Sequence, residues 1–514
     1  MGVITATLIV LTITYLISFA FRKIKFIYDK LTVFQGPAAL PFLGNFHQFH
    51  FAPDQFFEQA QGISYMMRRG DTRMTRIWLS GLPFVILYGA EEVEAVLGSP
   101  KMLNKPFLYQ FLSAWIGQGL LIAKPDKWRP RRKLLTPTFH YDILKDFVEV
   151  YNRHGSTLLS KFEALADKKP DEYTDIFHTI TLCTLDVICE AALGTSINAQ
   201  KNPHSPYLDA VFRMKEIVFD RLIRPHYYSD TLFNILGPGK EHNECVKILH
   251  EFTSKAIYER KAKVDAAGGV EQLLAQETAE GRRRMAFLDL MLDMNSKGEL
   301  PMEGICEEVD TFTFEGHDTT SAAMNWFLHL MGANPHIQSK VQQEIDDVLG
   351  EADRPITYED LGKLKYLEAC FKETLRLYPS VPLIARQCVE DITIRGNTLP
   401  AGTAVVMVPS MVHKDPKYWD DPEVFDPERF ISGVLKHPYA YIPFSAGSRN
   451  CIGMRFAMME EKCILAMILK KLKVKAKLRT DQMRVAAELI IRPMFGNELM
   501  FRRREFGEYS PIIA

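Results

Sequence analysis

Cys451 lies in a short loop that contains glycines and precedes a segment with the apolar stripe of a helix. The loop reads F-S-A-G-S-R-N-C-I-G over residues 444–453. Free backbone N–H groups and the positive end of a helix favour a thiolate at such a position. Gly447 permits a tight turn, and Gly453 would let a flat ligand approach the backbone. This loop therefore predicts a thiolate held beside a flat ligand.

Two further residues of the loop fit that chemistry. Arg449 could pair with a carboxylate of the ligand, and Phe444 could shield the sulfur from water. A single cysteine at the start of a helix is usually just a small buried residue. The complete spacing F-x-x-G-x-R-x-C-x-G is far more specific than the cysteine alone, so it is the most informative motif of the chain.

A second group of polar residues interrupts an apolar segment that has helical period. Glu315, Asp318 and Thr319 stand at i, i+3 and i+4, so they share one face of the predicted helix. Two carboxyls and a hydroxyl on such a face are costly unless they are partnered or used. Gly316 weakens the helix and opens space beside that face. The pattern alone leaves two interpretations, a solvated polar stripe or a reactive face.

A third motif is the pair Glu373 and Arg376, which lies off the apolar stripe of a predicted helix over 358–377. Periodicity alone predicts an exposed ion pair at i and i+3. Thr357 and Asp360 predict a capping box at the start of this helix.

Together, these motifs resemble those of the cytochromes P-450, from the Pro-rich segment 36–45 to about residue 500. The resemblance implies that family's fold, haem b as the cofactor and Cys451 as the proximal ligand of the iron. In that family the thiolate pushes electron density toward O–O cleavage. By the same likeness, Gly316 makes room for dioxygen, and Asp318 with Thr319 relays protons to it.

The resemblance also implies roles for residues away from the loop. Glu373 and Arg376 match the family's ExxR pair, which joins Arg429 of a P-E-R-F segment in support of the haem loop. The residues expected to hold the haem propionates are Trp128, Arg132, Arg386 and Arg449. One departure appears at Arg131, where the family often has His, and it affects only a minor propionate contact.

A narrower likeness covers residues 308–320, which read E-V-D-T-F-T-F-E-G-H-D-T-T. This run closely resembles family 4 of the cytochromes P-450, which includes fatty-acid omega-hydroxylases. In many of those enzymes the matching glutamate, here Glu315, forms an ester with a haem methyl group. The resemblance therefore implies a monooxygenase that inserts one oxygen atom from dioxygen into C–H bonds of a lipophilic substrate.

The elements that must position these residues are mainly helices, with small β-sheets. A β-rich run covers 84–88, and the runs 392–395 and 404–408 suggest a hairpin with each other. A polar, glycine-containing stretch at 263–284 suggests a surface loop. Helical period covers 141–165, 175–195, 206–222, 243–262, 302–332, 336–349, 358–377 and 454–472.

The N-terminus predicts a membrane anchor. Residues 3–21 carry no charge, and Arg22, Lys23 and Lys25 follow at once. As a helix this run is close to the thickness of a hydrocarbon core, and the basic cluster should stay in the cytosol. We therefore expect a single-pass anchor with its basic flank over 1–31 in the endoplasmic reticulum membrane. A Pro-rich hinge at 36–45 then leads into a haem-binding catalytic domain over 32–514.

Composition excludes several classes of protein. Lys and Arg number 62 against 63 Asp and Glu, so nothing indicates a nucleic-acid partner. The 8 cysteines contain no CxxC pair, which argues against a disulfide framework or a zinc cluster. Neither GxGxxG nor GxxxxGK[ST] occurs, so the chain shows no dinucleotide or nucleoside-triphosphate site of its own.

Electrons must then come from a separate protein. We expect NADPH–cytochrome P-450 reductase, with cytochrome b5 as a further candidate partner. The main alternative is a monooxygenase of another lipid or xenobiotic, acting by epoxidation or in-chain hydroxylation. A haem-thiolate isomerase or dehydratase is less consistent with the sequence, because such enzymes often lose the acid–alcohol pair that this chain keeps. A non-catalytic haem-binding protein is less consistent with the Asp318–Thr319 pair, because mere binding needs no proton relay.

Overall fold

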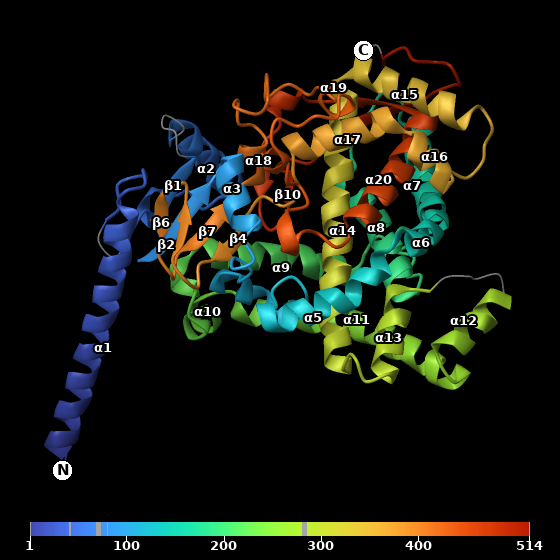
Figure 1. Cartoon of the computed structure of the whole chain (residues 1–514). Helices are drawn as coiled ribbons and strands as arrows, with labels where there is room; N and C mark the ends of the chain where they lie inside the picture. Colours follow the sequence, from blue (N-terminus) through green and yellow to red (C-terminus); the bar gives the residue numbers. More distant parts are fainter. Residues whose placement is uncertain (1, 41–42, 68–72, 80, 280–284, 513–514) are drawn as a thin grey trace.

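The computed structural model describes residues 2–40, 43–67, 73–79, 81–279 and 285–512. Residues 41–42 of the predicted hinge, 280–284 of the predicted loop and 513–514 of the predicted domain lie outside them. The chain is mainly helical with small sheets, as predicted (Figure 1). The helices are α1 (Gly2–Leu31), α2 (Pro53–Met67), α3 (Ala90–Leu97), α4 (Ser113–Ile116), α5 (Pro125–Leu135), α6 (Tyr141–Leu144), α7 (Val148–Lys168), α8 (Phe177–Leu193), α9 (Pro206–Ile223), α10 (Asp230–Leu236), α11 (Gly239–Ala267), α12 (Val270–Ala279), α13 (Phe287–Ser296), α14 (Met302–Ala333), α15 (Pro335–Leu349), α16 (Tyr358–Lys363), α17 (Lys365–Leu377), α18 (Pro409–Val412), α19 (Glu428–Ile431) and α20 (Met454–Lys471).

The strands form small separate sheets. The largest has the order β1-β2-β7-β4, with β2 and β7 parallel and the other pairs antiparallel. A second sheet has the order β3-β11-β8, and β5 with β6 and β9 with β10 form two-stranded ribbons. The strands are β1 (Met74–Leu79), β2 (Leu82–Leu87), β3 (Thr174–Asp175), β4 (Ile384–Gln387), β5 (Ile392–Ile394), β6 (Asn397–Leu399), β7 (Ala404–Met407), β8 (Leu472–Ala476), β9 (Val485–Ala487), β10 (Ile491–Pro493) and β11 (Glu498–Arg503).

Helix α14 runs through the middle of the body and is buried along most of its length (Figure 1). It packs along α8 and also contacts α11, α13, α15, α17 and α20. Its apolar residues pack on all sides in these surroundings, and its buried polar residues, among them Glu308, Asp310 and Asp318, need partners there. At Gly316, an added Cβ would lie 2.5 Å from Ile188 Cδ1 of α8. Glycine at this position therefore lets α8 approach α14 closely.

Helix α1 projects from the body (Figure 1). Many of its large apolar side chains are exposed. Its last turns behave differently, because Ile27 and Leu31 are buried in a core cluster with Phe34 and the strands of the largest sheet. The ring of Tyr28 also lies 5.2 Å from that of Trp78. Across the described residues, no helix is both long enough and apolar enough to cross a membrane. The transmembrane helix expected from the sequence is therefore not shown.

Local predictions had mixed outcomes. The capping box is confirmed, because Thr357 Oγ1 accepts from the N–H of Asp360 while the Asp360 carboxylate accepts from the N–H of Thr357. The single helix predicted over 358–377 is instead α16 and α17, with a break at Leu364. The predicted loop at 263–284 is wrong over its described part, which contains the end of α11 and all of α12.

The predicted hairpin is also wrong in its partner. β5 pairs with β6, while β7 pairs with β2 and β4. The reason is local, because Arg395 and Gly396 both have positive φ and close a two-residue turn straight after β5.

Candidate functional site

The loop that contains Cys451 is closed on itself just before α20. The N–H of Cys451 donates to the carbonyl of Phe444 at 2.9 Å. Gly447 has a φ of +68°, and an added Cβ there would lie 1.8 Å from the carbonyl oxygen of Leu97. Only glycine can occupy this position, as the motif predicted. The backbone therefore fixes the place of the cysteine.

A cavity of about 420 Å³ lies between this loop and α14. Cys451 is enclosed by protein but open toward this cavity. Its walls are mostly apolar, with side chains such as Phe139, Ala192, Phe314 and Leu383. The residues singled out from the sequence that line it are Trp128, Arg132, Glu315, Gly316, Asp318, Thr319, Phe444, Arg449, Cys451 and Gly453. The loop motif and the polar face of α14 thus meet across one apolar space.

The protein alone does not favour the thiolate form of Cys451. Burial raises the pKa of the Cys451 thiol to about 12, and the negative charge of Glu315 acts in the same direction. The N–H of Gly453 and the charge of Arg132 lower this pKa, but by less. Desolvation thus outweighs the helix start that the sequence suggested. A thiolate here needs a bound cation, and a metal ion would deprotonate the thiol outright.

On the opposite side, the polar residues of α14 are held by specific contacts. Thr319 Oγ1 donates to the carbonyl of Glu315 at 2.8 Å. Lys215 Nζ of α9 donates to both carboxylate oxygens of Asp318, at 2.8 and 3.0 Å, and both side chains are buried. The solvated stripe left open by the sequence is therefore wrong for Asp318. Burial raises the pKa of the Glu315 carboxyl to about 7, against the opposing effect of the Lys105 charge.

One group of cations near the cavity lacks anionic partners. Across the described ranges, no carboxylate lies within ion-pair distance of Lys105, Arg386 or Arg449. Burial, with the charges of Arg386 and Arg449, holds the pKa of Lys105 well below its usual value. Burial and the charge of Arg386 lower the pKa of Arg449 to about 9, and its buried Nε has no hydrogen-bond partner. Arg386 and Arg449 are buried and Lys105 is half-buried, so anionic groups of a ligand would stabilise their charges.

These residues fit the two propionates of a haem. Arg449 also stacks on the ring of Trp128, with 4.6 Å from Cζ to the ring centroid, and Arg132 donates to the carbonyl and side chain of Asn450. Arg386 does not line the cavity itself and donates to the carbonyl of Ala385, which does. Lys105 was missed in the sequence because no motif surrounds it.

Arg131, the departure from the family pattern, points elsewhere. It donates to Glu308 at 2.8 Å and to the carbonyl of Gly304 at 3.3 Å. It therefore ties α5 to α14.

The pair Glu373–Arg376 is buried, so the exposed ion pair that periodicity alone predicts is wrong. Arg376 donates to both carboxylate oxygens of Glu373, at 2.7 and 2.8 Å. Its remaining N–H groups donate to the carbonyls of His413, Pro422 and Val424. Arg429 lies 3.4 Å from the Glu373 carboxylate. These contacts tie α17 to the segment that leads into the cysteine loop.

Comparisons with known proteins agree with this site. The family model described as cytochrome P450 matches residues 34–498. The chain is 44% identical to cytochrome P450 4V2 of Rattus norvegicus over 476 residues, which cover 91% of this chain and 89% of the relative. It is equally similar, over the same shares, to cytochrome P450 4V2 of Homo sapiens. Cytochrome P450 4c3 of Drosophila melanogaster is 40% identical over 94% of this chain and 91% of its own length.

Proposed function

The chain belongs to the cytochrome P450 family and is a monooxygenase of its family 4, and on that premise we propose that it hydroxylates fatty acids, mainly at the omega carbon. The observation that carries this proposal is the position of Glu315, which lines the same mostly apolar cavity as Cys451. Apolar walls suit an alkyl chain. Bound haem would supply the activation of dioxygen and the insertion of one oxygen atom.

The residues around the cavity would divide the work of holding the haem. In this proposal Cys451 ligates the iron, Phe444 shields the sulfur, and Gly453 lets the flat ring approach the loop. Arg132, Arg449 and Trp128 would hold the propionates, with Arg386 placed behind the cavity wall at Ala385. We add Lys105 because it lines the cavity as a half-buried cation, and no carboxylate of the described residues lies at ion-pair distance from it. Glu315 would hold the haem through an ester to one of its methyl groups. Forming that bond breaks a methyl C–H bond and removes two electrons from its carbon, for which dioxygen, reduced with electrons from the reductase, is the oxidant. Glu373, Arg376 and Arg429 support the loop from behind through their buried contacts.

Asp318 and Thr319 would deliver protons on the side opposite the sulfur. Both oxygens of Asp318 accept hydrogen bonds from Lys215. One of these two hydrogen bonds would therefore have to break before the carboxylate could pass a proton toward Thr319. Lys215 is therefore a positioning residue in this proposal. It belongs to α9, which also lines the cavity with Val218 and Leu222. A substrate that displaces α9 would therefore also displace Lys215 relative to Asp318.

Selectivity for the omega carbon requires a rigid site. The C–H bond of the terminal methyl is stronger than that of the adjacent methylene. The protein must therefore hold the end of the alkyl chain and keep the adjacent methylene away from the iron. A haem fixed by Glu315 would help, because small errors in geometry carry large rate costs.

The test combines product analysis with haem extraction. Purified protein supplied with reductase and NADPH should convert fatty acids of graded length mainly to omega alcohols, and part of its haem should resist acid–acetone. Glu315→Ala should release all the haem and shift product toward the omega-minus-one position. Glu315→Gln, which keeps the size of the side chain but cannot form the ester, should do the same. Mostly in-chain hydroxylation or epoxides, with fully extractable haem, would remove the fatty-acid proposal and leave the monooxygenase.

We also propose that α1 attaches the protein to the endoplasmic reticulum membrane, with the body in the cytosol. Support comes from the exposed apolar side chains of α1, among them Ile4, Leu8 and Val10. Electrons would come from NADPH–cytochrome P450 reductase, with cytochrome b5 as a second donor, because the sequence has no dinucleotide motif of its own. Omitting the reductase should abolish NADPH-dependent product formation, and a chain that begins at Arg22 should leave the membrane fraction.

A further inference from the structure

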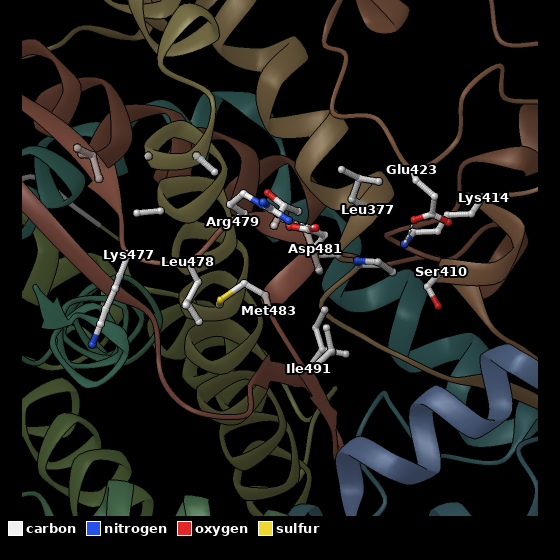
Figure 2. Close-up of a pocket in the computed structure, with 18 of the residues that line it drawn as sticks. Leu377, Ser410, Lys414, Glu423, Lys477, Leu478, Arg479, Asp481, Met483 and Ile491 are labelled. Carbon is white, nitrogen blue, oxygen red and sulfur yellow. Dashed lines mark hydrogen bonds and ion pairs between the residues drawn. The ribbon is translucent and has the colours of Figure 1, made fainter. Parts of the chain in front are cut away.

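A second pocket, of about 950 Å³, lies outside the haem cavity and shares no lining residue with it. Figure 2 shows it between the segment 477–483, the end of α17 and Ser410. Helix α2 and the C-terminal end of α14 complete its walls. Its size is that of a site for a small organic molecule.

The lining of this outer pocket combines an apolar floor with a charged rim. Its apolar side chains include Phe57, Leu377, Tyr378, Met483, Val485 and Ile491. Most charges at the rim already have partners. Arg479 pairs with Asp481 and Lys414 pairs with Glu423, as Figure 2 shows.

Lys475 is the exception at this rim. It lines the pocket, and within the described part of the chain no carboxylate lies at ion-pair distance from it. Its neighbour Lys477 is paired with Glu498 on β11. An apolar floor with one spare positive charge matches an anionic amphiphile, a molecule with an apolar body and a single acidic head.

The outer pocket and the haem cavity are separated by one thin wall made of two segments. Tyr378 and Pro379 line the outer pocket, and the chain then continues into 380–385, which lines the cavity. Val485 and Ile491, in the two strands of the β9–β10 hairpin, line the outer pocket, whereas 488–490 at its tip line the cavity.

These two segments are bonded to each other and to the proton-delivery residues. The N–H of Ile491 donates to the carbonyl of Ser380 at 2.9 Å. Ser380 Oγ donates to the carbonyl of Thr319 at 2.9 Å. A shift of the hairpin would therefore be transmitted both to the cavity wall and to α14 beside Thr319.

We propose that the outer pocket is an effector site that binds an anionic amphiphile, and that occupancy alters the haem cavity through the β9–β10 hairpin. A ligand that fills the pocket contacts Val485 and Ile491 on one side of the wall, and 488–490 respond on the other. Such coupling is reciprocal, so a ligand in the cavity must change the affinity of the outer pocket by the same factor. Neither statement depends on which substrate the enzyme oxidises.

The first arm of the test measures binding to the holoenzyme with 1-anilinonaphthalene-8-sulfonate, a fluorescent anionic amphiphile. Lys475→Glu should weaken its binding about tenfold or more, and Lys475→Gln by less. Lys263→Glu, a charge reversal at an exposed position of α11 that does not line the pocket, is the matched control and should bind like the wild type. Equal binding by the wild type and both Lys475 variants would overturn the site.

The second arm measures coupling with 4-phenylimidazole, a small ligand whose imidazole nitrogen would bind the haem iron and whose phenyl ring would occupy the cavity. Saturation of the outer pocket should change the affinity for 4-phenylimidazole at least threefold in the wild type and in Lys263→Glu. At the same probe concentration, Lys475→Glu should lose that change. An unchanged affinity for 4-phenylimidazole would refute the coupling. If the affinity for 4-phenylimidazole instead keeps falling as more 1-anilinonaphthalene-8-sulfonate is added, the two molecules compete for the haem cavity, and the outer site is refuted.

Discussion

Truncation before Thr32, at the boundary that the sequence suggests for the anchor, should destabilise the body. Such a chain loses Ile27 and Leu31, which are only 7% and 0% exposed in the core cluster beside the largest sheet. Full burial of each side chain is worth about 1.5–3 kcal/mol, so the loss should be about 3–6 kcal/mol. That is a large share of the ~5–15 kcal/mol that usually separates folded from unfolded protein.

A second truncation, which removes less of α1, tests this reasoning. A chain that begins at Arg22 removes the exposed apolar turns of α1 and keeps both core residues, so its stability should equal that of the full chain. Urea unfolding, followed by circular dichroism and by loss of the haem band, gives the free energy of unfolding for each form. If the chains that begin at Arg22 and at Thr32 unfold at the same urea concentration with the same slope, the two side chains contribute nothing and the assignment of these turns to the core is wrong.

Four further outcomes follow from the site. Cys451→Ala should lack the red-shifted Soret band of the reduced, carbon-monoxide-bound protein, and persistence of that band would exclude Cys451 as the ligand. Thr319→Ala should yield less product and more peroxide per NADPH, and unchanged coupling would remove it from proton delivery. Lys215→Met leaves Asp318 buried and unpaired and should cost about 3–5 kcal/mol of stability, whereas Lys215→Arg should largely restore both stability and coupling. In the haem-free protein, the pKa of Glu315 is raised to about 7. Its contribution to stability is therefore fully present below the usual glutamate pKa and is lost as pH rises toward 7, so Glu315→Gln should flatten the pH dependence of unfolding over that window.

The residues that meet at the cavity could be predicted from the sequence because they are close together along the chain. The loop around Cys451 and the i, i+3, i+4 face of α14 each lie within one short motif, and both line the same cavity. Lys215 and Lys105 could not be found in this way. Lys215 meets Asp318 across 103 positions of sequence, and a lone lysine on an amphipathic helix is normally solvated.

The errors have similar causes. Glu373 and Arg376 lie off the apolar stripe of α17, and periodicity places such residues in water. They are buried because the segment that contains His413 and Val424 covers that side of the helix and offers its carbonyls to Arg376. Strand pairing was predicted from neighbouring runs, whereas the parallel pair β2–β7 joins strands more than 300 residues apart, as Phe84 opposite Ala404 shows.

The continuity of α1 with the core has a mechanical consequence. Its 30 residues make a rod about 45 Å long that is clamped at one end and has no joint between its free end and the clamp. A rod of this kind transmits torque, whereas a flexible tether would not. When the free end is held at a lipid surface, the body cannot rotate freely about its attachment. The direction in which the cavity faces is then set by the rotation of α1 about its own axis. Encounters with an electron donor on the same surface then become a search in two dimensions between partners whose orientation is already restricted.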